Sequence, residues 1–186
     1  WASRTSILQY LGVHYIDIIR FVTSAYPKRV MAVGQKTEII DHGIDTFDAI
    51  QCIVDWEMPD GTIFTQTILT SWVDPDSSTA VSDQKIKFIG TKGRYEADQK
   101  ERGIRINTDN SGVQHINPDF CMSYGVDNGE IYWHGYGIES ITTFINDVVA
   151  LEAKSKALSD LEGNRPTFKE SSISTIVTEL AHKSLE

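Results

Sequence analysis

The stretch FDAIQCIVDWEMPDGTIFTQTILTSW (Phe47–Trp72) decides the fold, because it holds two alternating apolar runs separated by a short turn. Such alternation is typical of strands with one buried face. The turn, Met58–Gly61, contains Pro-Asp-Gly, which favours a tight reversal of the chain. Strands joined in this way pair antiparallel, so the stretch predicts a β-hairpin. In the first run the residues expected on the buried face are Ile50, Cys52, Val54 and Trp56.

Further strands are expected on both sides of this hairpin. Before it, KRVMAVGQK (Lys28–Lys36) is rich in β-forming residues, and the polar stretch DHGIDT (Asp41–Thr46) predicts a loop. After it, KIKFIGTKGRYEAD (Lys85–Asp98) holds two runs around a Gly-Thr-Lys-Gly turn, which predicts a second hairpin. GIRIN (Gly103–Asn107) predicts one more strand. Over residues 111–136 the regular pattern breaks down, and Cys121 is expected in a loop.

Three segments are expected to form helices, the first two because they have the apolar period of amphipathic helices. The first runs from Val13 to about Ser24, and the second is IESITTFINDVVALEAK (Ile138–Lys154). The third follows Thr167, which can cap it in a capping box with Glu170, and on it His182 is expected to face solvent. The stripe of the second helix consists of Ile138, Ile141, Phe144, Ile145, Val148 and Leu151.

The order of these elements predicts the fold class. A helix, several strands joined by tight turns and two closing helices give an α+β fold with an open, mostly antiparallel β-sheet and helices packed on one face. The 186 residues suffice for one domain, and we expect residues 1–186 to form a single domain. Apolar residues on both faces of the second hairpin strand, such as Ile68 and Leu69, predict that the uncovered sheet face joins copies into a homodimer or homotetramer.

Composition excludes several classes of protein. The net charge of −9 argues against a protein that binds nucleic acid through its phosphates. No stretch is long and apolar enough to span a membrane, and neither Cys52 nor Cys121 has a Cys or His partner at metal-binding spacing. No metal is therefore expected. Few cysteines and no signal segment favour a cytoplasmic location.

The sequence lacks a complete dinucleotide-binding loop and the nucleophile elbow of serine hydrolases. GYGIES (Gly135–Ser140) lies between a strand-like run and a helix, as a dinucleotide-binding loop would. However, Ser140 stands where the third glycine belongs, and no parallel strand with an acidic end follows. The glycines are therefore expected only to turn the backbone into the helix. No Gly-x-Ser-x-Gly elbow of a serine hydrolase occurs.

His14 and Asp17 place two polar groups at the start of an apolar helix that needs none. One turn apart, they could simply hydrogen-bond each other or the backbone. Histidine is also the side chain best suited to carry protons near neutral pH, so His14 is a candidate for acid/base chemistry. Trp72, at the start of a polar loop, could pack in the sheet or line the rim of a pocket.

Several stretches, in order and over nearly the whole chain, resemble one family. They are GVHYID (Gly12–Asp17), PKRVMAVGQK (Pro27–Lys36), KIKFIGTKGRYEAD (Lys85–Asp98), GYGIESITTFINDVV (Gly135–Val149) and the closing NRPTF helix. Together they are similar to the carboxy-terminal domain of the glucose-fructose oxidoreductase, inositol dehydrogenase and MocA-like (Gfo/Idh/MocA) oxidoreductases. The resemblance implies a sheet domain docked to an amino-terminal Rossmann domain, which would bind NAD or NADP and carry a catalytic lysine. We expect the chain, which opens on Trp1, to be part of such a longer protein.

The resemblance also implies roles for individual residues. In the family the Gly-x-His-x-x-Asp segment carries a catalytic histidine, which here is His14. Many relatives have an aspartate four residues earlier, where this chain has Tyr10, a possible proton relay that cannot act as a carboxylate. Asp17 is expected to anchor the helix. The candidate substrate-binding residues are Arg4, Trp72 and Tyr136.

The function implied by the resemblance is the substrate-binding and oligomerisation half of an NAD(P)-dependent oxidoreductase. Its substrate would be a sugar-like or polyol-like small molecule, and the chain alone would be inactive. The alternative is a non-catalytic ligand-binding or scaffold domain that has lost the chemistry, for which Tyr10 in place of aspartate is the clue. A glycine-rich phosphate loop and a lysine motif upstream would favour the enzyme.

Overall fold

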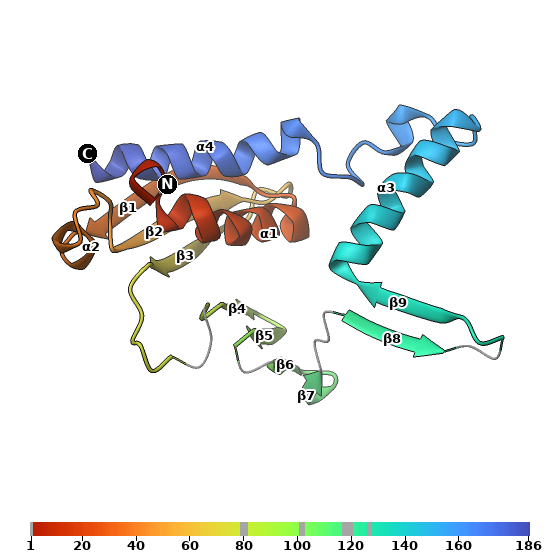
Figure 1. The fold of residues 1–186 in the computed structure, drawn as a ribbon, viewed down its shortest axis with the longest axis horizontal. Helices are drawn as coiled ribbons and strands as arrows, with labels where there is room; N and C mark the ends of the chain where they lie inside the picture. Colours follow the sequence, from red (N-terminus) through yellow and green to blue (C-terminus); the bar gives the residue numbers. More distant parts are fainter. Residues whose placement is uncertain (1, 79–81, 101–102, 117–120, 126–127) are drawn as a thin grey trace. The chain divides into compact units, whose positions relative to one another are not determined.

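The computed structural model describes residues 2–78, 82–100, 103–116, 121–125 and 128–186, which fall into two compact units (Figure 1). Unit 1 comprises Trp1–Ser78 and Pro166–Glu186, and unit 2 comprises Thr79–Arg165. Both termini therefore belong to unit 1. The α+β class is confirmed, and every described strand pair is antiparallel. The strands form three separate sheets, and a single domain over residues 1–186 stays a prediction.

Unit 1 is built on a three-stranded sheet in the order β1 (Tyr26–Gln35), β2 (Ala49–Glu57) and β3 (Ile63–Ser71). The predicted hairpin is confirmed, because β2 and β3 pair from Glu57–Ile63 to Ala49–Ser71. Its turn is closed by the Met58 N–H, which donates to the Thr62 carbonyl over 2.8 Å. Gly61 has a φ of 84°, a conformation that glycine adopts without strain.

Helices cover one face of this sheet. The helical entrance η2 (Leu8–Gly12) contacts β3, helix α4 (Phe168–Leu185) contacts β1, and α1 (Val13–Thr23) contacts α4 (Figure 1). A short 3-10 turn, η1 (Ala2–Arg4), precedes η2. The alternation in β2 is confirmed, since four of its apolar side chains are fully buried: Ile50, Cys52, Val54 and Trp56. Burial raises the pKa of the Cys52 thiol to about 11.

The short helix α2 (Glu38–Asp41) was not predicted, and Asp48 explains why it forms. The carboxylate of Asp48 accepts hydrogen bonds from the N–H groups of Thr37, Glu38 and Ile39 and from the Thr37 hydroxyl, over 2.6–2.9 Å. These hydrogen bonds lower the pKa of Asp48 from 3.8 to about 2, and the bond from the Ile39 N–H has the largest effect. A residue outside the helix thus satisfies its first N–H groups.

Helix α4 corrects two details of the prediction. Thr167 caps it as expected, because its hydroxyl accepts the Glu170 N–H over 3.3 Å. The Glu170 carboxylate, however, pairs with Arg20 of α1 over 2.9 Å. The placement of His182 on a solvent face is wrong: both ring nitrogens lie within hydrogen-bond distance of protein atoms. The polar residues around His182 did not indicate that it contacts Ser6, near the start of the chain.

Unit 2 contains two further sheets. The first has the order β4 (Lys85–Gly90), β5 (Gly93–Asp98), β6 (Gly103–Thr108) and β7 (Gly112–Ile116), which confirms the second predicted hairpin and the strand after it. The second pairs β8 (Cys121–Gly125) with β9 (Ile131–Gly135). Strands β7 and β8 were not predicted, and the placement of Cys121 in a loop is wrong, because Cys121 begins β8. Every residue of β7 is exposed. Because neither face of the strand is buried, its sequence shows no alternation of apolar and polar residues.

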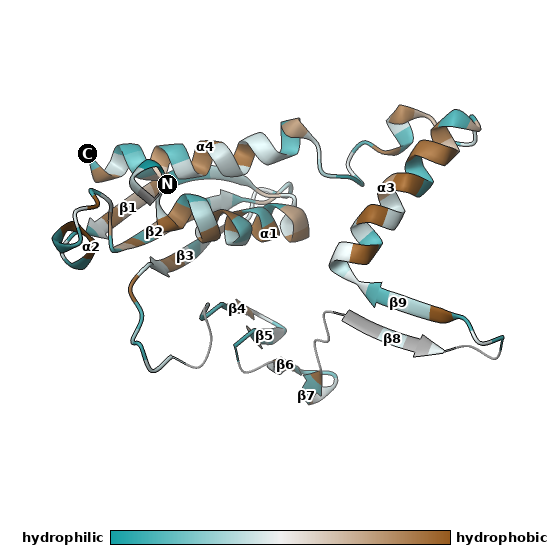
Figure 2. Ribbon diagram, viewed as in Figure 1, coloured by the Kyte–Doolittle hydropathy of each residue, from teal (hydrophilic) through white to brown (hydrophobic). Residues whose placement is uncertain are grey.

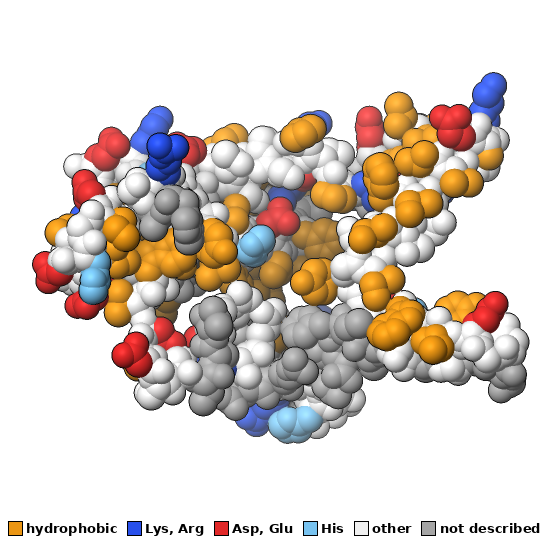
Figure 3. All heavy atoms as spheres, viewed as in Figure 1, with side chains coloured by type: hydrophobic (Ala, Val, Ile, Leu, Met, Phe, Trp, Pro, Cys, Tyr) orange, Lys and Arg blue, Asp and Glu red, His pale blue; other side chains and the backbone are white. Residues whose placement is uncertain are grey.

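Helix α3 (Tyr136–Glu152) follows β9, and a short 3-10 turn, η3 (Leu158–Asp160), follows α3. The apolar stripe predicted for α3 is present, but most of its side chains are exposed (Figures 2 and 3). The buried residue of α3 is Asp147, which pairs with Arg165 over 2.6 Å and with Lys156 over 3.0 Å. Arg165 and Lys156 lower the pKa of Asp147. In the described part of the chain, no helix is long and apolar enough to cross a membrane.

Candidate functional site

The site predicted around His14 begins with a reciprocal cap at Ser6. The Ser6 hydroxyl accepts the Gln9 N–H over 3.1 Å, and the Gln9 side-chain oxygen accepts the Ser6 N–H over 3.0 Å. This Ser-x-x-Gln capping box starts the chain into η2, a π-helical segment. Single π-helical turns occur frequently at functional sites. Tyr10 lies within this turn, and His14 lies in the first turn of α1.

Gly12, the first residue of the motif, lets the helical entrance approach β3 closely. A Cβ atom at this position would lie 2.6 Å from Leu8 Cδ1 and 3.2 Å from Thr70 Cγ2. Leu8 is fully buried, so its side chain has little room to move away. The φ of Gly12 is −61°, so the glycine is needed for space and not for its backbone conformation.

His14 and Tyr10 are both exposed on unit 1, and Tyr10 keeps 52% of its surface. Their spacing of four residues places them on one side of the helix. The Tyr10 ring lies 5.3 Å from the Trp72 ring, centroid to centroid, with 37° between the ring planes. Trp72 follows β3, and its backbone N–H donates to the Asp48 carbonyl over 2.8 Å. The structure thus brings the rings of Tyr10 and Trp72 together, and His14 follows Tyr10 by four residues and is exposed.

Helix α1 is fixed to its surroundings by polar contacts with β3 and α4. The Gln66 side chain of β3 donates to the Tyr15 carbonyl over 3.0 Å and accepts from the buried Trp56 indole over 3.0 Å. On another side, the Ser174 hydroxyl of α4 donates to Asp17 over 3.3 Å. This contact agrees with the expected anchoring role of Asp17.

Arg4 and Tyr136 complete the set of predicted site residues. Arg4 is exposed at the end of η1 in unit 1. Tyr136 begins α3 in unit 2 and is 79% exposed. The roles of Tyr136, His14, Tyr10, Arg4 and Trp72 at the site stay predictions.

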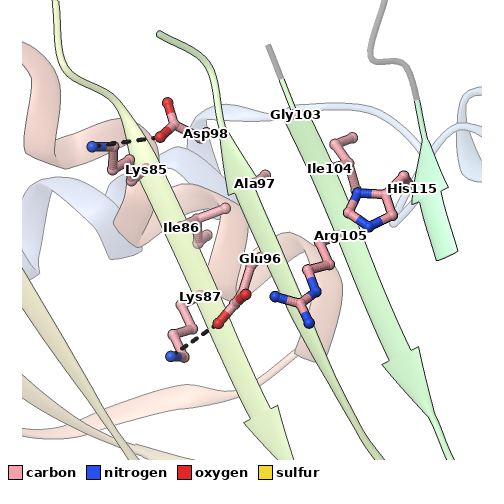
Figure 4. Close-up of a pocket in the computed structure, with 10 residues that line it drawn as sticks. All are labelled: Lys85, Ile86, Lys87, Glu96, Ala97, Asp98, Gly103, Ile104, Arg105 and His115. Carbon is pink, nitrogen blue, oxygen red and sulfur yellow. Dashed lines mark ion pairs between the residues drawn. The ribbon is translucent and has the colours of Figure 1, made fainter. Parts of the chain in front are cut away.

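A second candidate is a hollow of about 510 Å³ on the four-stranded sheet of unit 2 (Figure 4). Charged side chains from neighbouring strands line it and pair with one another. Lys87 contacts Glu96 over 2.9 Å, and Lys85 contacts Asp98 over 3.4 Å. Lys87 also lowers the pKa of Glu96. Because Lys85 and Lys87 are already paired with carboxylates, we rank the hollow below the site around His14.

Two further kinds of site were considered, a metal site and a phosphate site at the start of α3. No three His, Cys, Asp or Glu side chains among them come together to hold a metal ion. At the start of α3, the glycine segment leads into Glu139, whose carboxylate pairs with His134 over 2.8 Å. A carboxylate at this position would repel a phosphate group approaching the helix N-terminus.

Comparison with known proteins gives a family and a fold. The family model described as GFO/IDH/MocA C-terminal domain matches residues 1–96. An oxidoreductase from Sinorhizobium meliloti is similar with a TM-score of 0.66 and 15% identity, over 95% of this chain and 49% of its own. UDP-N-acetylglucosamine 3-dehydrogenase GnnA from Acidithiobacillus ferrooxidans is similar with a TM-score of 0.61 and 15% identity, over 97% of this chain and 47% of its own.

At this level of identity the two structures show the fold alone. The chain spans less than half the length of either of them. No curated protein sequence matches it.

Proposed function

The chain belongs to the GFO/IDH/MocA C-terminal domain family, and from this we propose that it is the substrate-binding and oligomerisation half of an NAD(P)-dependent oxidoreductase. In this proposal the substrate is a sugar-like or polyol-like small molecule, and a preceding Rossmann domain binds NAD or NADP. The observation that carries the proposal is the open placement of His14 on the first turn of α1, beside the Tyr10–Trp72 pair.

His14 is proposed to act as the acid/base group. When a substrate hydroxyl is oxidised, its oxygen must lose a proton while the carbon loses a hydride. An exposed imidazole can take that proton and return it in the reverse reaction. Nicotinamide chemistry would supply or accept the hydride from outside this chain. Tyr10, one helical turn away, is proposed as a proton relay or as a hydrogen-bonding partner of the substrate.

Two observations support the sugar-like substrate class. Aromatic side chains provide flat apolar surfaces with polar edges, and Tyr10 and Trp72 form such a surface next to His14. One structural relative is, by its name, a dehydrogenase of a sugar nucleotide. We carry only this broad class over to the present chain.

The proposed oligomer uses the face of the β1–β3 sheet that the helices leave uncovered. On this face, Val33, Gln51 and Leu69 lie side by side across the three strands, as do Met31, Ile53 and Thr67. Leu69 is 72% exposed, and Met31 and Val33 are also exposed. Exposed apolar sheet faces commonly mark contacts between protein chains.

A thermal-shift screen of the full-length protein tests the proposed function. NAD, NADH, NADP and NADPH are added singly and then together with a panel of sugars, sugar nucleotides and polyols. We expect one nucleotide pair to raise Tm, and one substrate class to raise it further, because a ligand that binds only the folded state stabilises it. The 186-residue chain serves as the matched control and should show no shift with nucleotide.

Two results would contradict the proposal. One is micromolar binding of NADH to the 186-residue chain, which would place the nucleotide site within it. The other is a full-length protein whose Tm rises with nucleotide but rises no further with any member of the panel. That second result would favour the non-catalytic alternative suggested by Tyr10.

A further inference from the structure

His182, near the end of the chain, reaches back to the cap that begins the site helix. Its Nε2 lies 2.8 Å from the Ser6 hydroxyl, across 176 positions of sequence. Its Nδ1 lies 2.6 Å from the Thr178 carbonyl, one turn earlier in α4. Ser6 is only 4% exposed, and its hydroxyl is the atom that accepts the Gln9 N–H of the capping box.

The partners of His182 determine where the protons lie. A carbonyl oxygen can only accept, so Nδ1 carries a proton and donates it to Thr178. In the neutral ring Nε2 is then an acceptor, and the Ser6 hydroxyl donates to it. The same hydroxyl accepts from Gln9 through its oxygen lone pairs. The buried hydroxyl is thereby satisfied as donor and as acceptor, and its direction is fixed.

We propose that His182 is a positioning residue for the site: by orienting the Ser6 hydroxyl, it holds the capping box and the π-helical turn that present Tyr10 and His14. This inference rests on the proposed function for the role of His14. It assigns no chemistry to His182 itself. The Tyr10 N–H donates to the Ser6 carbonyl over 2.9 Å, so the cap and the turn share one hydrogen-bonded unit.

Loss of the His182 contact would act first on this entrance. Without its acceptor, the Ser6 hydroxyl would keep a buried donor with no partner, or rotate away from Gln9 to find one. Either change weakens the cap, so the turn that carries Tyr10 opens more often. The sheet would be affected less, because its hydrogen bonds do not involve His182.

Two substitutions at this position separate the two bonds of the ring. In His182→Asn the amide nitrogen stands near the place of Nδ1 and can still donate to Thr178, but the side chain is too short for Ser6. In His182→Gln the amide reaches the place of Nε2 and can meet the Ser6 hydroxyl. The glutamine variant is therefore the conservative rescue, and the asparagine variant is its matched control.

The test uses NMR on the protein in its wild-type, asparagine and glutamine forms. In His182→Asn we expect the amides of Gln9 and Tyr10 to exchange about tenfold faster, as the loss of one hydrogen bond implies, while β2 amides such as Cys52 are unchanged. The Tyr10 ring signals should also shift, because their environment includes the Trp72 ring. His182→Gln should restore both readouts to near the wild-type values.

Two results would overturn the inference. One is an asparagine variant that matches the wild type at Gln9 and Tyr10. The other is faster exchange throughout unit 1 with no rescue by glutamine, which would give His182 a general structural role. Neither readout depends on catalysis, so a His14 that proved inactive in chemistry would remove the proposed function and leave this test intact.

Discussion

The Tyr10 ring contacts the Trp72 ring at a centroid distance of 5.3 Å, which joins the helical entrance to the end of β3. The backbone of Trp72 is held in turn by Asp48, which also caps α2. The surface next to His14 is therefore built from one helix turn and one strand end that are fixed independently.

The Tyr10–Trp72 contact should appear as a coupling energy. In a double-mutant cycle with Tyr10→Leu and Trp72→Leu, we expect a coupling of about 0.5–1.5 kcal/mol in the free energy of unfolding, the usual value for an aromatic pair. Denaturant unfolding gives the free energy of unfolding of the wild type, the two single mutants and the double mutant. Tyr10→Phe keeps the ring and should keep the coupling; additive effects of the two leucine substitutions would show that the rings do not interact.

Gly12→Ala should destabilise the protein. The added methyl group would meet Leu8 and Thr70 within 2.6 and 3.2 Å, and such overpacking costs about 1–3 kcal/mol. Gly137→Ala is the control, because it also lies in a helix but meets nothing within 4 Å. There the change should be neutral or stabilising, by up to about 1 kcal/mol. Equal effects at the two positions, measured by thermal unfolding, would argue against the close approach of the entrance to β3.

Asp48 should make the stability of the protein depend on pH at the acidic end. Its pKa is lowered from 3.8 to about 2 in the folded state, so its contribution is complete above about pH 4 and is lost as the pH falls towards 2. Denaturant unfolding between pH 2 and pH 7 should therefore show a smaller acid loss in Asp48→Asn, which is less stable at pH 7. Asp76→Asn, in the exposed loop after β3, should match the wild type; the same pH profile for all three proteins would refute the assignment.

The uncovered sheet face should hold copies of the protein together. We expect light scattering to show a dimer or tetramer, with a contact of more than about 1,000 Å², and Leu69→Lys to shift it towards the monomer. Phe168→Lys is the control, because Phe168 is 98% exposed but lies on α4, away from this face. A wild-type protein that stays monomeric at high concentration would contradict the proposed interface.

Local sequence patterns were sufficient for the elements whose signal is local. The β2–β3 hairpin is predicted by its alternation and its Pro-Asp-Gly turn, and α1 by its apolar period. The exposed strand β7 has no such period, because no face of it is buried. Helix α2 depends on a carboxylate that comes from beyond the helix, so its own residues did not predict it.

At the candidate site, too, local patterns identified some residues, while others depend on contacts with distant parts of the chain. The Gly-x-His-x-x-Asp segment pointed to His14, and its departure from the family pattern pointed to Tyr10. The groups that hold this segment come from far along the chain. Gln66 reaches Tyr15 over 51 positions, and His182 reaches Ser6 over 176. Such pairs have no spacing rule, so only the folded chain reveals them.

The most direct test of the account is the turnover of the full-length enzyme with His14→Ala. His14 is exposed and contributes little to the core, so unfolding should change far less than the 2–5 kcal/mol or so of a core cavity. His42→Ala, which removes another exposed histidine of unit 1, is the control and should keep full activity. If His14 transfers the proton, its loss should lower kcat by about 10²–10⁴-fold. A kcat equal to that of the wild type, in a folded variant, would contradict the account.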